Sequence, residues 1–138
     1  MKPMFLLENN EFPFYDTSHA NKTFNSISLI NLNSIQDFEK KINQKIKLQR
    51  FRGNFYIDGL EAWEERKWIG KTIKINNVSF KVEENIPRCV AINLKPKTDD
   101  NSLNLLQSLK KTYNHLDMGI YLRALNNGNI EAGHKIKL

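Results

Sequence analysis

The sequence predicts a mainly β or α+β domain: a small, barrel-like sheet with two or three short helices. Many short apolar segments are separated by turn residues, a pattern that is typical of small all-β and α+β domains. Only a few stretches carry apolar residues at the three- and four-residue spacing of a helix. The 138 residues suffice for one domain that buries its own core without disulfides.

The chain divides into an N-terminal arm, residues 1–25, and a domain that spans residues 26–138. From residue 8 onward the arm is polar and contains Pro13, so we expect it to be loosely structured and to drape over the domain. No internal repeat and no low-complexity linker divides the rest of the chain.

A strand and a short helix are expected at the start of the domain. Alternating apolar residues predict the strand over 26–32, and apolar residues at helical spacing predict the helix over about 35–43. Ser34 is the expected N-cap, because a serine hydroxyl accepts a hydrogen bond from the first helical turn, and Asp37 lies where a capping box needs an acid.

The middle of the chain contains the clearest local signal, a β-hairpin. The elements expected here are a strand over 54–57, helical turns over 61–68, and strands over 72–75 and 78–82. The last two strands alternate cleanly around Asn76-Asn77, and asparagine tolerates positive φ, so we expect a two-residue turn between them.

The last third is expected to mix strands with one helix. A strand over 89–94 ends at Lys95-Pro96, Ser102 caps a helix that runs to about Lys111, and Tyr113-Asn114-His115 forms the exit from that helix. A strand over 118–125, an Asn-Gly turn and a closing strand over 130–138 complete the domain.

The positive charge is concentrated in one stretch. The formal net charge is +6, and residues 40–52 hold six lysines and arginines with no acid between them. Such a stretch attracts nucleic acid, a phosphorylated cofactor or an acidic partner, or it is simply a solvated face. A nucleic-acid partner is not expected, because exposed aromatic residues are not interleaved and no known binding motif is present.

The chain has a single cysteine, Cys89, which directly follows Arg88. One cysteine excludes an intrachain disulfide and a cysteine-only metal cage, so we expect a reducing compartment, the cytoplasm. The sequence also shows neither a signal peptide nor a segment apolar enough to span a membrane. Cys89 is either a reactive thiol, acting as a nucleophile or a soft metal ligand, or a small buried hydrophobe. A neighbouring guanidinium would favour the reactive thiolate form.

The stretch Arg50-Phe51-Arg52-Gly53-Asn54 is the second candidate site. If it enters a strand, residues 50, 52 and 54 share one face, and two guanidiniums with an amide could hold a phosphate. Alternatively, the arginines pair on the surface with acids from the segment 61–65. The three histidines have no ligand spacing among themselves or to Cys89, so a zinc site is not expected.

Taken together, these segments resemble the MOSC domain, the C-terminal domain of molybdenum cofactor sulfurases and of amidoxime-reducing molybdoenzymes. The matching stretches are 28–35, 50–60, 62–65 with Trp68, Arg88-Cys89-Val90, 119–121 and 128–133. They follow the family's order and spacing from about residue 26 to the C-terminus.

The resemblance implies a barrel-like fold and either binding of a pterin-type molybdenum cofactor or a sulfur-carrying role. Cys89 falls on the family's cysteine, which ligates molybdenum in the reductases and is proposed elsewhere to carry sulfur as a persulfide. Arg52 and Asn54 fall on positions that hold the pterin and phosphate end, as does the loop that contains Ser34, and Arg88 lies beside the metal ligand. With Arg50, these residues form the expected cofactor site.

The resemblance also implies partners. We do not expect residues 1–25 to replace the N-terminal β-barrel domain that helps to enclose the cofactor in the reductases, so either the cofactor affinity is low or a second chain completes the pocket. That chain is a desulfurase, a reductase, a molybdoenzyme or a second copy of this protein. The sequence leaves open whether the chain is itself an oxidoreductase or a sulfur-transfer protein. Two positions depart from the family: Gly133-His134 replaces Gly-Asp, and Lys95-Pro96 replaces Asp-Pro.

Overall fold

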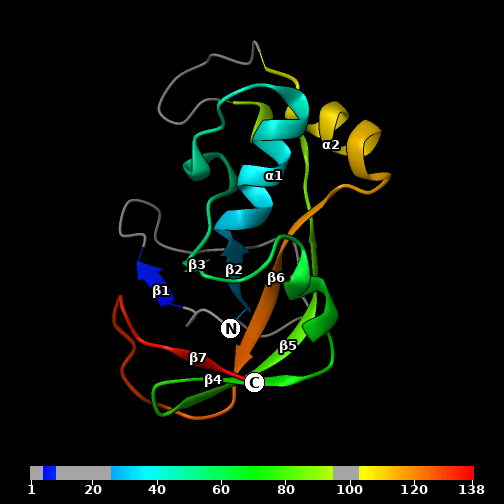
Figure 1. Cartoon of the computed structure of the whole chain (residues 1–138). Helices are drawn as coiled ribbons and strands as arrows, with labels where there is room; N and C mark the ends of the chain where they lie inside the picture. The colour runs from blue at the N-terminus through cyan, green and yellow to red at the C-terminus, as the bar shows by residue number, and fades with distance from the viewer. Residues whose placement is uncertain (1–4, 9–25, 95–102) are drawn as a thin grey trace.

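The computed structural model describes residues 5–8, 26–94 and 103–138, and these form a seven-stranded sheet with two α-helices (Figure 1). The strands are β1 (Phe5–Glu8), β2 (Ser26–Asn31), β3 (Phe55–Asp58), β4 (Thr72–Ile75), β5 (Val78–Pro87), β6 (Asp117–Ala124) and β7 (Ile136–Lys137). The helices are α1 (Leu32–Ile42) and α2 (Leu105–Tyr113), with short 3₁₀ helices η1 (Leu48–Phe51), η2 (Glu64–Trp68) and η3 (Val90–Asn93).

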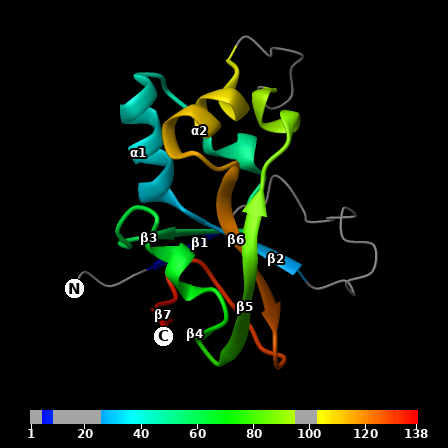
Figure 2. The ribbon, with the colours of Figure 1, turned by 90° about the vertical axis from the view of Figure 1, so that its right-hand side faces the viewer.

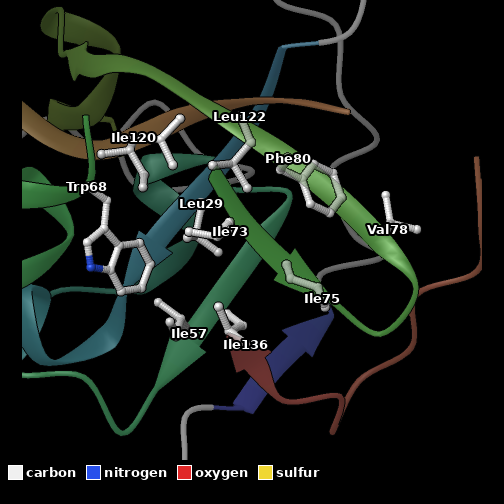
Figure 3. Close-up of a cluster of buried hydrophobic side chains, with 11 residues drawn as sticks. Leu29, Ile57, Trp68, Ile73, Ile75, Val78, Phe80, Ile120, Leu122 and Ile136 are labelled. Atoms are coloured by element: carbon white, nitrogen blue, oxygen red, sulfur yellow. The ribbon is translucent and has the colours of Figure 1, made fainter. Parts of the chain in front are cut away.

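The sheet has the order β1-β3-β2-β6-β5-β4-β7. Every neighbouring pair is antiparallel except β2 and β3, which are parallel and are joined by the crossover through α1 and η1. The sheet curls, so that Ile57 of β3 and Ile136 of β7 line the same core although they belong to distant strands (Figure 3). The mainly β, barrel-like fold predicted from the sequence is therefore confirmed.

Two hydrophobic clusters stabilise the domain. The first fills the curl of the sheet and includes Leu29 and Phe80 (Figure 3). The second lies around the two helices, which pack side by side at one end of the sheet, and includes Ile30 and Phe38 (Figure 2). Leu29 and Ile30 are neighbours in β2 and serve different clusters because successive side chains of a strand point to opposite faces.

Helix α1 begins earlier than the sequence predicts. Its N-cap is Asn31, whose side-chain oxygen accepts a hydrogen bond from the backbone N–H of Asn33 at 3.0 Å. The prediction of Ser34 as the N-cap is therefore wrong, since an asparagine cap is already in place at the end of β2. The helix ends at Ile42 and is followed by Asn43, which has positive φ and caps it.

Other local predictions are confirmed. Strands β4 and β5 form a hairpin that pairs Ile75 with Val78, and Asn76 adopts φ 53° in the turn. Helix α2 ends at Tyr113 and is followed by Asn114 in the left-handed conformation, as expected for a helix exit.

Three strand predictions are wrong. The segment 50–54 is not extended, because Arg50 ends up in η1 and Arg52 adopts φ 51°. The segment 89–94 is η3 and its flanks, since the extended chain ends with β5 at Pro87. The closing strand is only β7, two residues long, rather than 130–138.

Strand β1 pairs with β3 and was not predicted, because it lies within the stretch assigned to the arm. The predictions for residues 9–25, Lys95-Pro96 and the Ser102 cap lie outside the described residues. In the described part of the chain, no helix combines the length and apolarity that crossing a membrane requires.

Candidate functional site

Cys89 lies at the junction between β5 and η3. Its side chain is exposed, and its backbone is extended, with φ −121° and ψ −178°. The Cys89 carbonyl accepts a hydrogen bond from the N–H of Ile92 at 3.2 Å, which closes the first turn of η3. The exposed thiol excludes the alternative in which Cys89 is a small buried hydrophobe.

Arg88 holds the chain immediately before the thiol. Its Nε and Nη2 donate to the carbonyl of Met118 in β6 at 2.9 and 2.7 Å. Its Nη1 donates to the carbonyl of Phe51 at 2.7 Å, and the guanidinium lies 5.5 Å from the centre of the Phe51 ring. Arg88 therefore brings the end of β5 against η1, so that the two sequence motifs meet.

Arg50 and Arg52 have opposite environments. Arg50 is buried in η1, and its Nη1 donates to the carbonyls of Ile92 at 3.3 Å and Asn93 at 2.7 Å. Surface pairing with the acids of segment 61–65 is therefore wrong for Arg50. Arg52 is exposed, and its guanidinium has no hydrogen-bond or ion-pair partner among the described residues. Of the two, Arg52 presents its charge to solvent, where an anion could reach it.

Asn54 joins the start of β3 to β2. Its Oδ1 accepts from the backbone N–H of Ser28 at 2.8 Å and from the Ser28 hydroxyl at 3.0 Å, while its own backbone N–H donates to Ser28 Oγ at 2.9 Å. The side-chain Nδ2 has no partner in the described part of the chain. The Asn54 side chain thus fixes the backbone of β2 through its oxygen, and its nitrogen remains available as a donor within the described part of the chain.

Ser34 belongs to a separate, buried network. Its hydroxyl donates to Glu65 Oε1 at 2.9 Å and accepts from the backbone N–H of Trp63 at 2.8 Å. Asn31 Nδ2 donates to Glu65 Oε2 at 2.8 Å and also to the carbonyl of Glu61. Burial raises the pKa of Glu65, and the hydrogen bonds from Asn31 and Ser34 offset only part of that effect.

The structure therefore joins the segment 88–93, which carries Cys89, to η1 through hydrogen bonds of Arg88 and Arg50, and Arg52 and Asn54 follow η1 in the chain. The hydroxyl of Ser34 is fully buried and its hydrogen bonds run to η2 and the residue before it. Sequence reasoning missed the role of Glu65 in this network, because nothing in the local pattern distinguishes it from its exposed acidic neighbours.

A second cluster missed by sequence reasoning lies where α1, η2 and α2 meet. Asp37 Oδ2 accepts hydrogen bonds from Tyr113 Oη at 2.6 Å and from Trp63 Nε1 at 2.9 Å, and forms an ion pair with Lys41 at 3.1 Å. Although desolvation opposes it, these donors and the charge of Lys41 lower the pKa of Asp37. Desolvation and the bond to Asp37 raise the pKa of Tyr113. The hydrogen bond from Tyr113 to Asp37 joins α2 to α1 across a sequence separation of 76 residues.

The site offers one soft ligand. Within the described ranges, no group of three or more histidine, cysteine, aspartate or glutamate side chains could hold a metal ion. A metal held through Cys89 would therefore need most of its ligands from elsewhere, as a sulfur-rich organic cofactor supplies them. The exposed thiol, together with the Arg52 guanidinium and the Asn54 amide donor, which have no partner among the described residues, fits an anionic, phosphorylated group of this kind.

The fold and the site define a class of protein: small, curled-sheet domains with a thiol exposed at the end of a strand. Two solved structures share the fold. They are YiiM from Geobacillus stearothermophilus, with TM-score 0.60 and 19% identity, covering 83% of this chain and 54% of that one, and YuaD from Bacillus subtilis, with TM-score 0.61 and 14% identity, covering 80% of this chain and 61% of that one.

The chain belongs to the MOSC domain family, whose model matches residues 16–137. It is 33% identical over 92 residues to mitochondrial amidoxime reducing component 2 of Rattus norvegicus, covering 67% of this chain and 25% of that protein. It is also 33% identical over 102 residues to molybdenum cofactor sulfurase of Caenorhabditis elegans, covering 71% of this chain and 14% of that protein. The chain thus spans a quarter or less of these relatives.

Proposed function

We propose that this MOSC domain binds a pterin-type molybdenum cofactor, with Cys89 as the protein's ligand to the metal. Membership of the family supports a role related to the molybdenum cofactor. The observation that supports Cys89 as the metal ligand is its exposed thiol. The hydrogen bond from Arg88 to Phe51 holds the chain before this thiol against η1, which Arg52 directly follows. A thiolate suits a soft, redox-active metal, and the guanidinium offsets the charge of a phosphate.

In this proposal each residue has a distinct task. The bound cofactor supplies a metal that can change its oxidation state. Cys89 donates its thiolate, Arg52 binds the phosphate, and Asn54 Nδ2 donates a hydrogen bond to the pterin end. Arg88 fixes the backbone on the N-terminal side of the ligand. Ser34, with its hydroxyl occupied by Glu65 and Trp63, shapes the loop at the start of α1 from within.

The test is the molybdenum and pterin content of protein purified without oxygen from cofactor-replete cells. We expect the wild type to hold both, Cys89→Ser to lose the metal, and Arg52→Gln to lose at least tenfold in cofactor content. Arg123→Gln is the matched control, because Arg123 is also exposed but pairs with Glu83 at the far end of β6. A wild type without molybdenum, or Cys89→Ser with wild-type content, would contradict the proposal.

A second candidate, sulfur transfer, is favoured by the same exposed thiol. The Cys89 thiolate would attack the outer sulfur of a persulfide on a partner desulfurase. The donor's sulfur–sulfur bond would break, and the donor cysteine would leave as a thiolate. After incubation with a desulfurase and free cysteine, intact-mass measurement should show one added sulfur, absent from Cys89→Ser. No added sulfur on a metal-free wild type would eliminate this candidate.

A further inference from the structure

Two arginines fasten the segment around Cys89 to η1. One anchors the chain just before the thiol, and the other anchors the chain just after it. Arg88, immediately before Cys89, donates to the carbonyl of Phe51 at the end of η1. Arg50, within η1, donates back to the carbonyls of Ile92 and Asn93, which follow Cys89 in η3. The chain that carries the thiol is therefore fastened to η1 at both ends.

Stability alone is a poor explanation for Arg50. The side chain is only 7% exposed, and no carboxylate of the described residues pairs with it. Its hydrogen bonds reach neutral carbonyls, and its Nε is buried with no hydrogen-bond partner in the part of the chain that the structure describes. A buried cation of this kind is costly, and an apolar side chain of similar volume is often equally or more stabilising.

Among the described residues, the hydrogen bonds between η3 and η1 come from Arg50. Of its four residues only Ile92 is buried, and Val90, next to the thiol, is 69% exposed. The turn is closed by two long backbone hydrogen bonds, Ile92 N–H to Cys89 at 3.2 Å and Leu94 N–H to Ala91 at 3.3 Å. Asn93 Oδ1 accepts from the backbone N–H of Leu106, which fastens η3 to α2 but not to η1.

We propose that Arg50 is a positioning residue that fixes the Cys89 thiol relative to the guanidinium of Arg52. The proposal rests on the proposed function of Cys89 as metal ligand. Arg52 directly follows η1, and its backbone N–H donates to Gln49 within η1 at 3.1 Å. Because Arg50 ties η1 to η3, the anion-binding group and the metal ligand are held as one unit, and a cofactor can meet both at once.

The test compares the wild type with Arg50→Met, Arg50→Lys and the control Arg123→Met. Methionine fills the space without hydrogen bonds, whereas lysine retains the charge and can donate hydrogen bonds from a single nitrogen. Backbone hydrogen exchange at Ile92 and Leu94 reports on η3, the unfolding midpoint reports on the whole fold, and molybdenum content reports on the site.

We expect Arg50→Met to keep the wild-type unfolding midpoint, to lose at least tenfold in amide protection at Ile92 and Leu94, and to lose at least tenfold in molybdenum content. Arg50→Lys, which cannot reproduce the geometry of the guanidinium, should lie between Arg50→Met and the wild type in both measurements, and Arg123→Met should match the wild type. Wild-type protection at both amides in Arg50→Met would overturn the proposal, as would wild-type molybdenum content in that variant. If Arg50→Met does not fold, Arg50→Lys decides: protection intermediate between folded and unfolded values supports the proposal, and wild-type protection overturns it.

The readouts separate this inference from the function on which it rests. A wild type that holds no molybdenum overturns the metal-ligand role of Cys89, whatever Arg50 does. A wild type that holds molybdenum, together with an Arg50→Met variant that holds as much, overturns only the role of Arg50.

Discussion

The Glu65 carboxyl, only 1% exposed, determines how the loop at the start of α1 is built. Both of its oxygens accept hydrogen bonds, from Ser34 and from Asn31, and Ser34 in turn accepts from the backbone of Trp63. Removing the carboxyl would leave the Ser34 hydroxyl without its acceptor in a buried site, which costs about 1–3 kcal/mol for each such group. Glu65 therefore joins β2, α1 and η2 at one point.

The cost of replacing Glu65 should depend strongly on the substituent. We expect Glu65→Ala to lower the free energy of unfolding by about 3 kcal/mol, because it leaves buried donors unpaired. Glu65→Gln should cost less than about 1 kcal/mol at pH 7, since it keeps an acceptor and removes a buried charge. Urea unfolding measures both, and Glu64→Gln, on an exposed side of the same turn, is the control.

The pH dependence follows from the raised pKa of Glu65. In the folded chain this pKa lies above the ordinary value of 4.5, so the folded chain binds the proton more tightly than the unfolded chain. The contribution of Glu65 to stability is therefore full below pH 4.5 and is lost as the pH rises through the folded-state pKa. The unfolding free energy of the wild type minus that of Glu65→Gln should fall across this window, and a flat difference would contradict the prediction.

Gly119 in β6 should tolerate substitution less well than Gly133. A Cβ at Gly119 would lie 2.8 Å from the carbonyl oxygen of Leu29, whereas a Cβ at Gly133 would meet nothing within 4 Å. Both have positive φ, so an alanine costs about 1–2 kcal/mol at either position from backbone strain alone. Gly119→Ala should cost about 2 kcal/mol more than Gly133→Ala in thermal or urea unfolding, and equal costs would contradict the clash.

At the scale of elements, local signals predicted the hairpin and both helices, because turn residues and apolar spacing act over a few neighbours. The same signals failed at η1 and η3, where contacts between distant segments decide the backbone. The bond from Arg50 to Asn93 spans 43 residues, and that from Arg88 to Phe51 spans 37. Strand β1 was missed for the same reason, since its hydrogen-bonding partner β3 begins about fifty residues later.

Asp37 should stabilise the contact between α1 and α2 as a charged acceptor. Tyr113→Phe removes one donor to this carboxylate and should lower the unfolding free energy by about 1–2 kcal/mol, and Asp37→Asn should lower it by a similar amount. The lowered pKa of Asp37 means that this stabilisation is present above pH 3.8 and is lost as the pH falls through the folded-state value.

The measurement for Asp37 is urea unfolding between pH 3 and pH 7. The destabilisation by Asp37→Asn should shrink as the pH falls below 3.8, because protonation of Asp37 removes the charge that asparagine also lacks. Asp58→Asn is the control, as the Asp58 carboxyl is exposed and accepts from its own neighbour, Gly59. A cost for Asp37→Asn that is independent of pH would contradict a role for its charge.

At the scale of the whole molecule, the two hydrophobic clusters should unfold together. Strand β2 contributes Leu29 to one and Ile30 to the other, so neither cluster can lose its packing without disturbing the shared strand. Each cluster also has its own tryptophan: Trp68 lies in the cluster inside the curl, and Trp63 packs against the one around the helices. The domain is of the size that commonly unfolds in one step.

Single-tryptophan variants test this cooperativity. Trp63→Phe leaves only the reporter inside the curl, and Trp68→Phe leaves only the reporter near the helices. Within each variant, urea transitions followed by fluorescence and by far-UV circular dichroism should coincide in midpoint. A fluorescence transition that precedes the loss of secondary structure in either variant would show that the clusters separate.

The sequence predicted which residues belong to the candidate site, but not which of them are buried and which are exposed. The thiol of Cys89 and the charge of Arg52 both proved exposed, and the sequence singled out both. The burial of Ser34 and Arg50 could not be foreseen, because it depends on η2 and η3 closing over them from other parts of the chain.

The exposure of Cys89 has a practical consequence. Because the chain has a single cysteine, the unmodified protein already carries one unique attachment point for a fluorophore or spin label, and that point is at the candidate site. Air oxidation would join two chains through these thiols and place their candidate sites face to face. The fraction of covalent dimer on a non-reducing gel therefore measures how much of a preparation is blocked.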